Sequence, residues 1–514
     1  MDLLINWMLR AVYLGLGAGA GLWIVRWVRS NRGRSEERWT VRLAAGMLLL
    51  AGVYAIAHVR LLAQRSEIEE GREAYAVYGD PRRTELRRGE VRGWILDCTG
   101  EGDRALAYYG ADGEGIERRY PLGEAGANFL GGGAGAEERD YTVEALYAAE
   151  LRAPASFLER GELHPAGRDL PLTLCRGVTA EAYRQLSQTG RPGAVVVQDV
   201  RTGAVLAYAA TGDRGDPPLG IKRYSPPGSV FKLALAALWW EHGMPDAIPI
   251  PCPAEIQVTP RAAIGNFGNV GYGTVQGPTG MLVPSCNTAA VWMALRMREE
   301  IGSEPFIEGY RRFGFETYEE SPPTDSIGGF WRTDSEAWNR RMTPAPSRIR
   351  ISDSTGDAEW GQLAIGQGPL DVTVVAVSRF IQAIANDGLM AAPTIEQELA
   401  SGGAAGERVM SEGTARRLQE AMRAVVDRGT GRAAGQLVQG TGWGLGGKTG
   451  TAQVAGRPDN GWFAGILFGP EGDPRYTVVS FLEGGGPGGG MPARAAGGVA
   501  RYLAETVPQV GAEQ

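Results

Sequence analysis

The chain has 514 residues, of which 43% are hydrophobic and 22% are charged, and this composition is typical of a folded protein of two to four domains. The formal net charge is −7 at pH 7, so the chain lacks the basic character that a nucleic-acid-binding protein needs. The four cysteines lie far apart and predict neither a disulfide framework nor a zinc site, although one structural disulfide stays open. Only 3 histidines are present, so a nucleophilic serine would need a base other than imidazole.

Residues 1–64 are predicted to anchor the protein in a membrane. The segment 43–64 is an apolar run long enough to cross a bilayer, and Arg60 near its end could reach the interface. A second apolar run, residues 3–28, predicts another span. The loop between the runs is rich in arginine, and short basic loops stay in the cytoplasm. Everything after about residue 65 is therefore expected outside the cytoplasmic membrane. Glycines in the first run form a small-residue face for the second span or for a partner helix.

Two β-hairpins are predicted beyond the anchor. Residues 92–109 contain two strand-like runs around a turn rich in glycine and aspartate. Residues 193–210 contain a Val-rich strand, a turn at 201–203 and a second strand. The intervening residues 110–170 are rich in glycine and charge and do not predict a large core of their own. The glycine-rich stretch 484–490 is interpreted as a mobile loop.

Residues 224–232, YSPPGSVFK, place a serine and a lysine at the start of a strongly apolar helix. Gly228 and the two prolines mark the helix start, and Ser229 and Lys232, three residues apart, share one helix face. A lysine that loses its proton in a desolvated site can activate a serine, and the helix N-terminus adds positive potential. The alternative is a structural one, in which the serine caps the helix, the lysine is exposed and neither residue is catalytic.

Two later motifs favour the catalytic interpretation. The first is Ser285-Cys286-Asn287, and the second runs from Lys448 to Thr451 with the sequence KTGT. The order SxxK, SxN and KTG is the signature of active-site serine enzymes that recognise penicillin. Cys286, between two polar site residues, is interpreted as a small packed side chain and not as a nucleophile.

With these motifs the chain resembles the penicillin-binding proteins, and specifically the class B transpeptidases of peptidoglycan synthesis, over roughly residues 90–505. RGWILDCTG at 92–100 is similar to the pedestal hairpin of that family, and residues 364–388 and 425–431 are similar to segments that flank its catalytic motifs. The resemblance implies an α/β fold with an antiparallel sheet flanked by helices and an all-helical lobe. The expected parts are a membrane anchor over 1–64, a small pedestal domain over 65–170 and the transpeptidase domain over 171–514.

The resemblance also implies a role for each residue of the first two motifs. Ser229 would be the acylated nucleophile, with Lys232 as its base. Ser285 would relay a proton to the leaving amine, and Asn287 would orient Lys232 and the substrate amide.

The third motif would lie on the edge strand of the sheet. Lys448 would supply a cation, and Thr449 and Thr451 would hold the terminal carboxylate of the substrate. Gly450 would let the peptide pair closely with the strand. The backbone N–H groups of Ser229 and Thr451 would form the oxyanion hole.

The implied function is that of a peptidoglycan D,D-transpeptidase in the cell membrane, with its catalytic domain outside the cytoplasm. Its substrates would be stem peptides ending in D-Ala-D-Ala, β-lactams would inhibit it, and no metal or cofactor is implied. The expected partner is a polytopic glycosyltransferase of the shape, elongation, division and sporulation (SEDS) family. The alternatives are a serine D,D-carboxypeptidase or β-lactamase-like hydrolase, and a scaffold that activates a cell-wall polymerase. A role in elongation, division or sporulation is left open.

Overall fold

The computed structural model describes most of the chain from residue 92 to residue 506. The described ranges are 92–100, 102–112, 115–132, 141–152, 167–212, 218–315, 330–344, 347–352, 354–403 and 406–506, with the single residues 25, 26, 29, 52 and 54. The predicted anchor over 1–64 lies outside these ranges apart from the single residues. No helix within them is both long enough and apolar enough to cross a bilayer.

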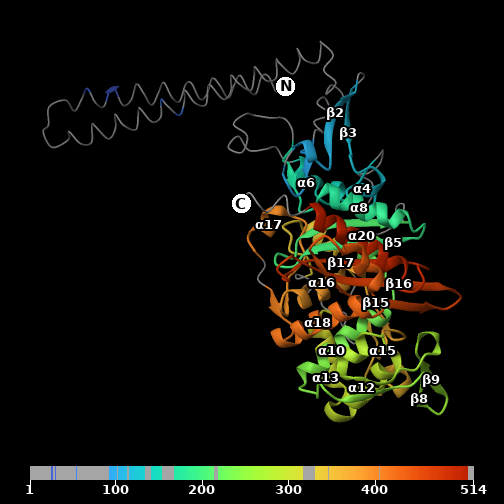
Figure 1. The fold of residues 1–514 in the computed structure, drawn as a ribbon. Coiled ribbons are helices and arrows are strands. Elements are labelled where there is room, and N and C mark those ends of the chain that lie inside the picture. The colour runs from blue at the N-terminus through green and yellow to red at the C-terminus, as the bar shows by residue number, and fades with distance from the viewer. Residues whose placement is uncertain are drawn as a thin grey trace. The chain divides into compact units, whose positions relative to one another are not determined.

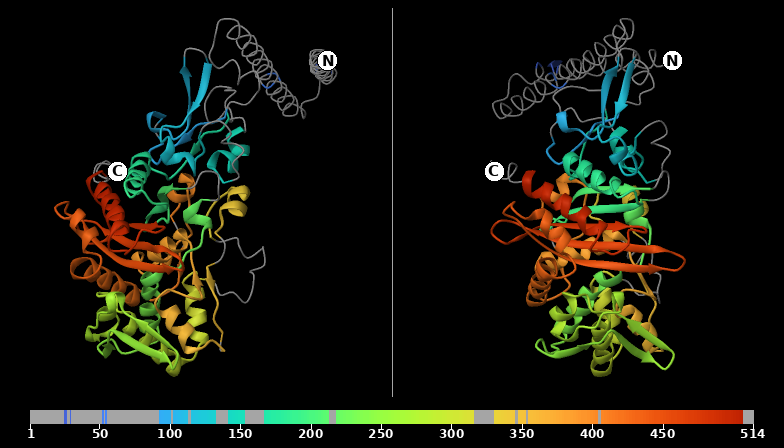
Figure 2. Two further views of the ribbon diagram at one scale, coloured as in Figure 1. Left: turned by 90° about the vertical axis from the view of Figure 1, so that its right-hand side faces the viewer. Right: turned by 45° about the vertical axis from the view of Figure 1, so that its right-hand side comes forward.

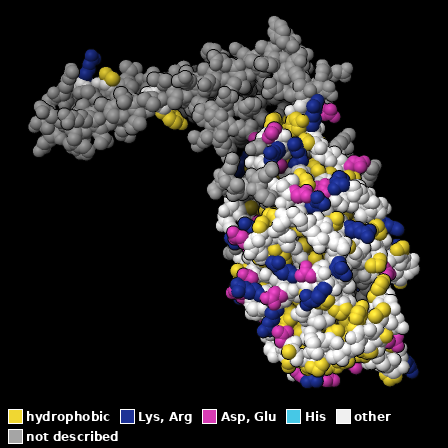
Figure 3. All heavy atoms as spheres, viewed as in Figure 1, with side chains coloured by type: hydrophobic (Ala, Val, Ile, Leu, Met, Phe, Trp, Pro, Cys, Tyr) yellow, Lys and Arg dark blue, Asp and Glu magenta, His cyan; other side chains and the backbone are white. Residues whose placement is uncertain are grey.

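One compact unit contains nearly all of the described structure. It comprises residues 90–110, 117–155 and 164–514, and the second unit comprises residues 1–89, 111–116 and 156–163. On the face of the molecule seen in Figure 3, Lys and Arg side chains are interspersed with Asp and Glu side chains. The view agrees with the mixed charge of the sequence.

A five-stranded antiparallel sheet forms the centre of the large unit, in the order β15-β16-β17-β5-β6 (Figure 1). The strands are β5 (Gly193–Asp199), β6 (Val205–Thr211), β15 (Gly444–Val454), β16 (Arg457–Phe468) and β17 (Pro474–Leu482). The hairpin predicted over 193–210 is confirmed as β5 and β6. Because this early hairpin pairs with a meander from the end of the chain, β15 remains at the edge of the sheet.

Helices cover both faces of the sheet and enclose two apolar cores. Along β5, Val195 and Val197 contact one core while Ala194 and Val196 contact the other, as the two-residue period of a strand requires. Figure 1 shows α8 and α20 above the strands and α18 below them. The covering helices are α8 (Arg176–Ser187), α16 (Val374–Ala385), α18 (Glu412–Arg428), α19 (Arg432–Val438) and α20 (Met491–Thr506).

A lobe below the sheet consists of helices and two small strand pairs (Figure 2). The helices are α10 (Lys232–Glu241), α11 (Gly277–Leu282), α12 (Asn287–Ile301), α13 (Glu304–Arg312) and α15 (Asp357–Ala364). The antiparallel pairs are β7 (Pro249–Cys252) with β10 (Gly273–Gln276), and β8 (Glu255–Thr259) with β9 (Ala262–Gly265). The expectation of an all-helical lobe is therefore wrong, because residues 249–276 combine prolines and glycines with short alternating runs that favour hairpins.

The N-terminal part of the large unit differs from its prediction. The hairpin expected over 92–109 is reduced to one antiparallel bridge between Ile95 and Ala107. Residues 102–104 form a 3-10 helix (η2) where a tight turn was expected, so the two runs separate. The other elements here are β1 (Ile95–Leu96) parallel to β4 (Leu170–Pro171), α4 (Glu124–Ala127), α5 (Val143–Leu146) and α6 (Ala148–Arg152). A separate pair of strands is formed by β2 (Tyr108–Asp112) and β3 (Gly115–Arg119), of which residues 111–116 belong to the second unit.

Shorter elements connect these parts. They are α9 (Leu219–Lys222), η4 (Gly228–Phe231), η5 (Phe267–Asn269), α14 (Glu336–Met342), β11 (Arg348–Ile349), β12 (Leu370–Asp371), β13 (Leu389–Met390), α17 (Gln397–Ser401) and β14 (Glu407–Arg408).

All four cysteines form disulfides, so the expectation of at most one is wrong. Cys98 bonds Cys175 across 77 residues, and Cys252 bonds Cys286 across 34 residues. The Cα atoms lie 4.9 and 6.4 Å apart, within the usual range for disulfides. Because the fold brings distant residues together, the spacing along the sequence did not reveal the pairs. The first disulfide joins the segment after β1 to the N-cap of α8.

A buried carboxylate holds the N-terminal part together. Glu144 in α5 is fully buried and bonds Arg92 Nη1 at 2.7 Å and Arg118 Nε at 2.9 Å. Arg118 also donates to the carbonyl of Gly93 at 2.8 Å. The cluster therefore links β3, α5 and the segment that leads into β1.

The substitution Glu144→Gln tests this cluster. It removes the negative charge that two mostly buried guanidinium groups, those of Arg92 and Arg118, both contact, so we expect a loss of about 3–5 kcal/mol in the free energy of unfolding. Urea unfolding followed by tryptophan fluorescence measures the change. The control is Glu308→Gln, because Glu308 pairs with Arg311 at 64% and 49% side-chain exposure and such pairs contribute roughly 0–1 kcal/mol. Equal losses in the two variants would contradict the expectation.

Candidate active site

Ser229 lies in a short 3-10 turn that directly precedes α10. The turn is η4 (Gly228–Phe231), and α10 begins at Lys232. Gly228 has φ 54°, in the left-handed region that favours glycine, and its N–H donates to the carbonyl of Gly366 at 2.9 Å. The segment 364–388 therefore supports the turn. The cap interpretation of the motif is wrong, because Ser229 caps neither helix and Lys232 is fully buried.

The Lys232 amine is held by two short hydrogen bonds. Its Nζ donates to Asn287 Oδ1 at 2.6 Å and to the carbonyl of Ser285 at 2.7 Å. Burial, and then the nearby charge of Lys448, hold the pKa of Lys232 well below its ordinary value and so favour the neutral amine. A neutral amine has two N–H groups and one lone pair. The two short bonds use both N–H groups, so the lone pair remains able to accept a proton.

Lys448 approaches the same serine from the edge strand. Its Nζ donates to Ser285 Oγ at 2.8 Å and to the carbonyl of Thr449 at 2.9 Å. The side chain is fully buried, and burial lowers its pKa to about 7. Ser285 Oγ also lies 3.4 Å from Lys232 Nζ. The backbone of Ser285 has φ 60°, an uncommon conformation for a residue other than glycine. The structure thus brings Lys232, Ser285, Asn287 and Lys448 into one hydrogen-bonded cluster.

Cys286, the middle residue of the second motif, is half of a disulfide. It is buried as expected, but it is bonded to Cys252 at the end of β7 and is not a free packed thiol. Its backbone also occupies the N-cap position of α12. The disulfide therefore fastens the segment that contains Ser285 and Asn287 to a neighbouring strand.

The threonines of β15 have partners on two further segments. Thr449 Oγ1 lies 2.6 Å from Thr430 Oγ1, and Thr451 Oγ1 accepts a hydrogen bond from the N–H of Gly488 at 3.2 Å. Thr430 was not predicted as a site residue, although it lies in the recognised segment 425–431. The only sign of it in the sequence was its place in that segment, because a threonine by itself does not indicate a site residue.

The glycine-rich loop 484–490 packs tightly against the edge strand, so its interpretation as mobile is wrong. A Cβ atom on Gly488 would lie 2.3 Å from the carbonyl oxygen of Gly450. The N–H of Gly486 donates to the carbonyl of Asp459 at 2.9 Å. Here glycine allows the backbone of the loop to lie close to that of the strand. The composition of a segment does not distinguish this role from flexibility.

Gly450 brings the turn of Ser229 against the edge strand. A Cβ atom on Gly450 would lie 2.4 Å from the carbonyl oxygen of Pro227, and one on Gly228 would lie 2.4 Å from that of Thr451. The structure therefore gives Gly450 a further use, because the glycine makes room for the turn that carries the serine. Its expected pairing with the substrate peptide stays a prediction.

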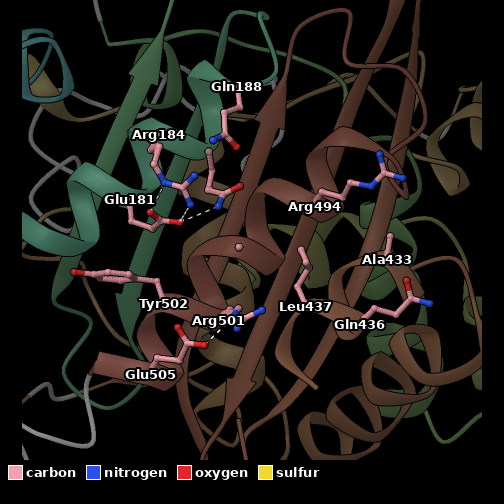
Figure 4. Close-up of a pocket in the computed structure, with 12 residues that line it drawn as sticks. Glu181, Arg184, Gln188, Ala433, Gln436, Leu437, Arg494, Arg501, Tyr502 and Glu505 are labelled. Carbon is pink, nitrogen blue, oxygen red and sulfur yellow. Dashed lines mark hydrogen bonds and ion pairs between the residues drawn. The ribbon is translucent and has the colours of Figure 1, made fainter. Parts of the chain in front are cut away.

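A pocket elsewhere on the unit is separate from this cluster. It lies among α8, α19 and α20, has a volume of about 640 Å³ and is lined by none of the motif residues (Figure 4). Two arginines in it pair within their own helices, Arg184 with Glu181 and Arg501 with Glu505. The walls of the pocket are therefore polar, and none of its lining residues belongs to the hydrogen-bonded cluster.

Comparison with known proteins gives a consistent result. The penicillin-binding protein transpeptidase domain family matches residues 193–505. Penicillin-binding protein PbpB of Mycobacterium tuberculosis is 30% identical over 71% of this chain and 58% of its own length. The probable peptidoglycan D,D-transpeptidase PenA of Neisseria meningitidis is 24% identical over 72% of this chain and 64% of its own length. The chain thus covers less than two thirds of either relative.

A solved structure shares the fold. The ampicillin complex of penicillin-binding protein 3 from Mycobacterium tuberculosis is 25% identical, with a TM-score of 0.62, and the match covers 81% of this chain and 95% of that one.

The substitution Gly450→Ala tests the contact between strand and turn. The added methyl group would meet the Pro227 carbonyl at 2.4 Å and displace Ser229. Because displacements of about 1 Å in a reactive site cost on the order of 100-fold in rate, we expect labelling of Ser229 by fluorescent penicillin to slow by about that factor. The control is Gly444→Ala on the same strand, whose Cβ would first meet the flexible side chain of Arg423 at 3.3 Å. Similar labelling rates for the two variants would refute the assignment.

Proposed function

The chain belongs to the penicillin-binding protein transpeptidase family, and on this basis we propose that it is a class B peptidoglycan D,D-transpeptidase. The observation that carries the proposal is the cluster in which Lys232 and Lys448, two buried amines, share Ser285 next to the turn of Ser229. The named activities of its relatives support the same reaction, the cross-linking of stem peptides.

In the proposed acylation, Ser229 Oγ forms a bond with the carbonyl carbon of the penultimate D-alanine. Its proton passes to the lone pair of Lys232. The bond to the terminal D-alanine breaks, and Ser285 gives its proton to the leaving amine. Ser285 then recovers a proton from Lys232, whose Nζ lies 3.4 Å from Ser285 Oγ. An amine of a second stem peptide then forms a bond with the acyl carbon, and the ester bond to Ser229 breaks. The proton lost by that amine passes through Lys232 to Ser229 Oγ, which restores the free serine.

The edge strand binds the substrate in this proposal. The hydroxyl groups of Thr449 and Thr451 and the charge of Lys448 hold the terminal carboxylate, and Thr430 joins them through its contact with Thr449. The N–H groups of Ser229 and Thr451 stabilise the oxyanion. In this proposal β-lactams acylate the same serine, and the related structure in complex with ampicillin supports the binding of a β-lactam.

A transpeptidase is favoured over a hydrolase by the partners of the cluster. A hydrolase needs a base that activates water against the acyl-enzyme. Within the described ranges, the hydrogen-bond partners of Lys232, Ser285, Asn287 and Lys448 are amide, carbonyl and hydroxyl groups, and none is a carboxylate.

The location and the domains are also proposals. The apolar runs 3–28 and 43–64 and the basic loop between them support a membrane anchor with residues 65–170 and 171–514 outside the cytoplasm. Two disulfides support the same location, because disulfides persist outside the reducing cytoplasm. The glycine face of the first run supports a polytopic SEDS-type glycosyltransferase as partner.

Labelling with fluorescent penicillin tests the proposed function. The purified full chain should be labelled at one site, and the label should persist for many minutes, because the cluster's partners in the described ranges include no carboxylate that would activate water. Ser229→Ala should abolish labelling. Lys232→Arg should slow it by about 100-fold or more, because a guanidinium does not give up its proton. Rapid repeated turnover of a chromogenic β-lactam would instead identify a hydrolase.

The pH dependence of acylation tests the role of Lys448. Its pKa of about 7 means that its cation is present below that pH and is lost as the pH rises, so the second-order rate constant for an anionic penicillin should fall above about pH 7. Lys448→Arg should acylate more slowly but without this decline, because arginine keeps its charge. The control Lys222→Arg, at a partly buried lysine outside the cluster whose pKa is also lowered by burial, should keep the decline. A decline that persists in Lys448→Arg would assign the titration to another group.

A further inference from the structure

Asn266 makes an unusual number of hydrogen bonds beside the cluster. The residue follows β9 and is 8% exposed. Its Oδ1 accepts from the backbone N–H of Asn287 at 2.7 Å and of Thr288 at 3.2 Å. Its Nδ2 donates to the carbonyls of Pro253 and Val270, each at 2.8 Å. Both ends of the amide are therefore committed, and its orientation is determined by its partners.

Two of these bonds provide acceptors for the first N–H groups of α12. The first N–H groups of a helix have no partner within the helix and are usually capped by the residue just before it. Here that residue is Cys286. Of the backbone N–H groups in the first turn, its Sγ accepts that of the third helical residue, Ala289, at 3.2 Å. Asn266, which follows β9 of the β8–β9 pair, caps the first two residues of the helix, Asn287 and Thr288.

The backbone and side chain of Asn287 are held by consecutive residues. Asn266 holds its N–H, and the carbonyl of Gly265 accepts from its Nδ2 at 2.8 Å. Because a carbonyl accepts only from the amide nitrogen, this bond directs Asn287 Oδ1 to the other side. There it accepts from Lys232 Nζ at 2.6 Å.

We propose that Asn266 is a positioning residue for acylation, which holds Asn287 so that Asn287 Oδ1 accepts one N–H of Lys232 and the lone pair of that amine stays available to Ser229. The inference rests on the proposed function, since it concerns the same base. Asn266 itself touches no reacting atom. Without it, the backbone N–H groups of Asn287 and Thr288 lose their acceptor, and the start of α12, which carries the Asn287 amide, is held less firmly.

The test separates the rate constant of acylation from the affinity that precedes it. Stopped-flow reaction with fluorescent penicillin gives both values for the purified full chain. Asn266→Ala should lower the acylation rate constant by about 10- to 100-fold and change the affinity by less than about twofold, because a displaced catalytic group costs rate on this order. Asn266→Ser, which keeps a smaller acceptor, should lie between wild type and Asn266→Ala.

Two features keep the test decisive. The rate constant reports only molecules that react, while the amplitude reports the folded fraction, so partial unfolding does not mimic the effect. The control Ser411→Ala removes the cap of α18, whose Oγ accepts from Thr414 N at 3.2 Å, and should lower stability without changing the rate constant.

The outcomes distinguish the two proposals. Equal acylation rate constants in wild type, Asn266→Ser and Asn266→Ala would overturn the role of Asn266 alone. A weaker affinity of Asn266→Ala with an unchanged rate constant would overturn that role as well. Failure of the wild type to be labelled at Ser229 would overturn the proposed function first.

Discussion

The site depends on keeping two lysine amines out of water with acceptors that carry no charge. Burial opposes the ammonium form of both Lys232 and Lys448. A carboxylate partner would stabilise the ammonium and raise the pKa, and the amine would then be a poor base at neutral pH. The actual partners are an amide, two carbonyls and the hydroxyl of Ser285. They satisfy the N–H groups without the rise in pKa that a carboxylate would cause. Lys232 can therefore act as a base, while Lys448 still carries its cation below about pH 7.

This arrangement is possible because each contributing segment is fastened by contacts of its backbone. The turn of Ser229 rests on β15 through Gly228 and Gly450, where no side chain intervenes. The start of α12 is held by the disulfide of Cys286 and by Asn266. A site assembled from segments far apart in the chain keeps a productive geometry only when such contacts limit its movement.

Much of the fold and site could be predicted from local sequence. The SxxK, SxN and KTG motifs predicted that Lys232, Ser285, Asn287 and Lys448 lie in one site. The Val-rich run of β5 and the turn at 201–203 revealed one hairpin of the sheet. These signals are short-range patterns whose meaning depends little on context. The membrane anchor stays a prediction, since it lies outside the described ranges.

The features that were missed depend on long-range packing. Cys98 and Cys175 meet only after the fold has formed, and Asn266 resembles any loop asparagine until α12 is placed beside it. The stretch 484–490 has the composition of a flexible loop, but its glycines allow close packing against β15. In the lobe, residues 249–276 form strand pairs that the family resemblance did not include.

The strand order of the sheet also determines when the protein can fold. Gly193 in β5 pairs with Leu482 in β17, so the strand made early in translation receives its second neighbour almost last. Until then the edge of β5 in the β5–β6 hairpin has no neighbouring strand, and such edges favour aggregation. Pairing over so long a stretch of chain is slow, because loop closure precedes any gain from contact. A chain that stops before β17 would lack the partner of β5 and leave this edge open, which makes the last part of synthesis decisive for the whole domain.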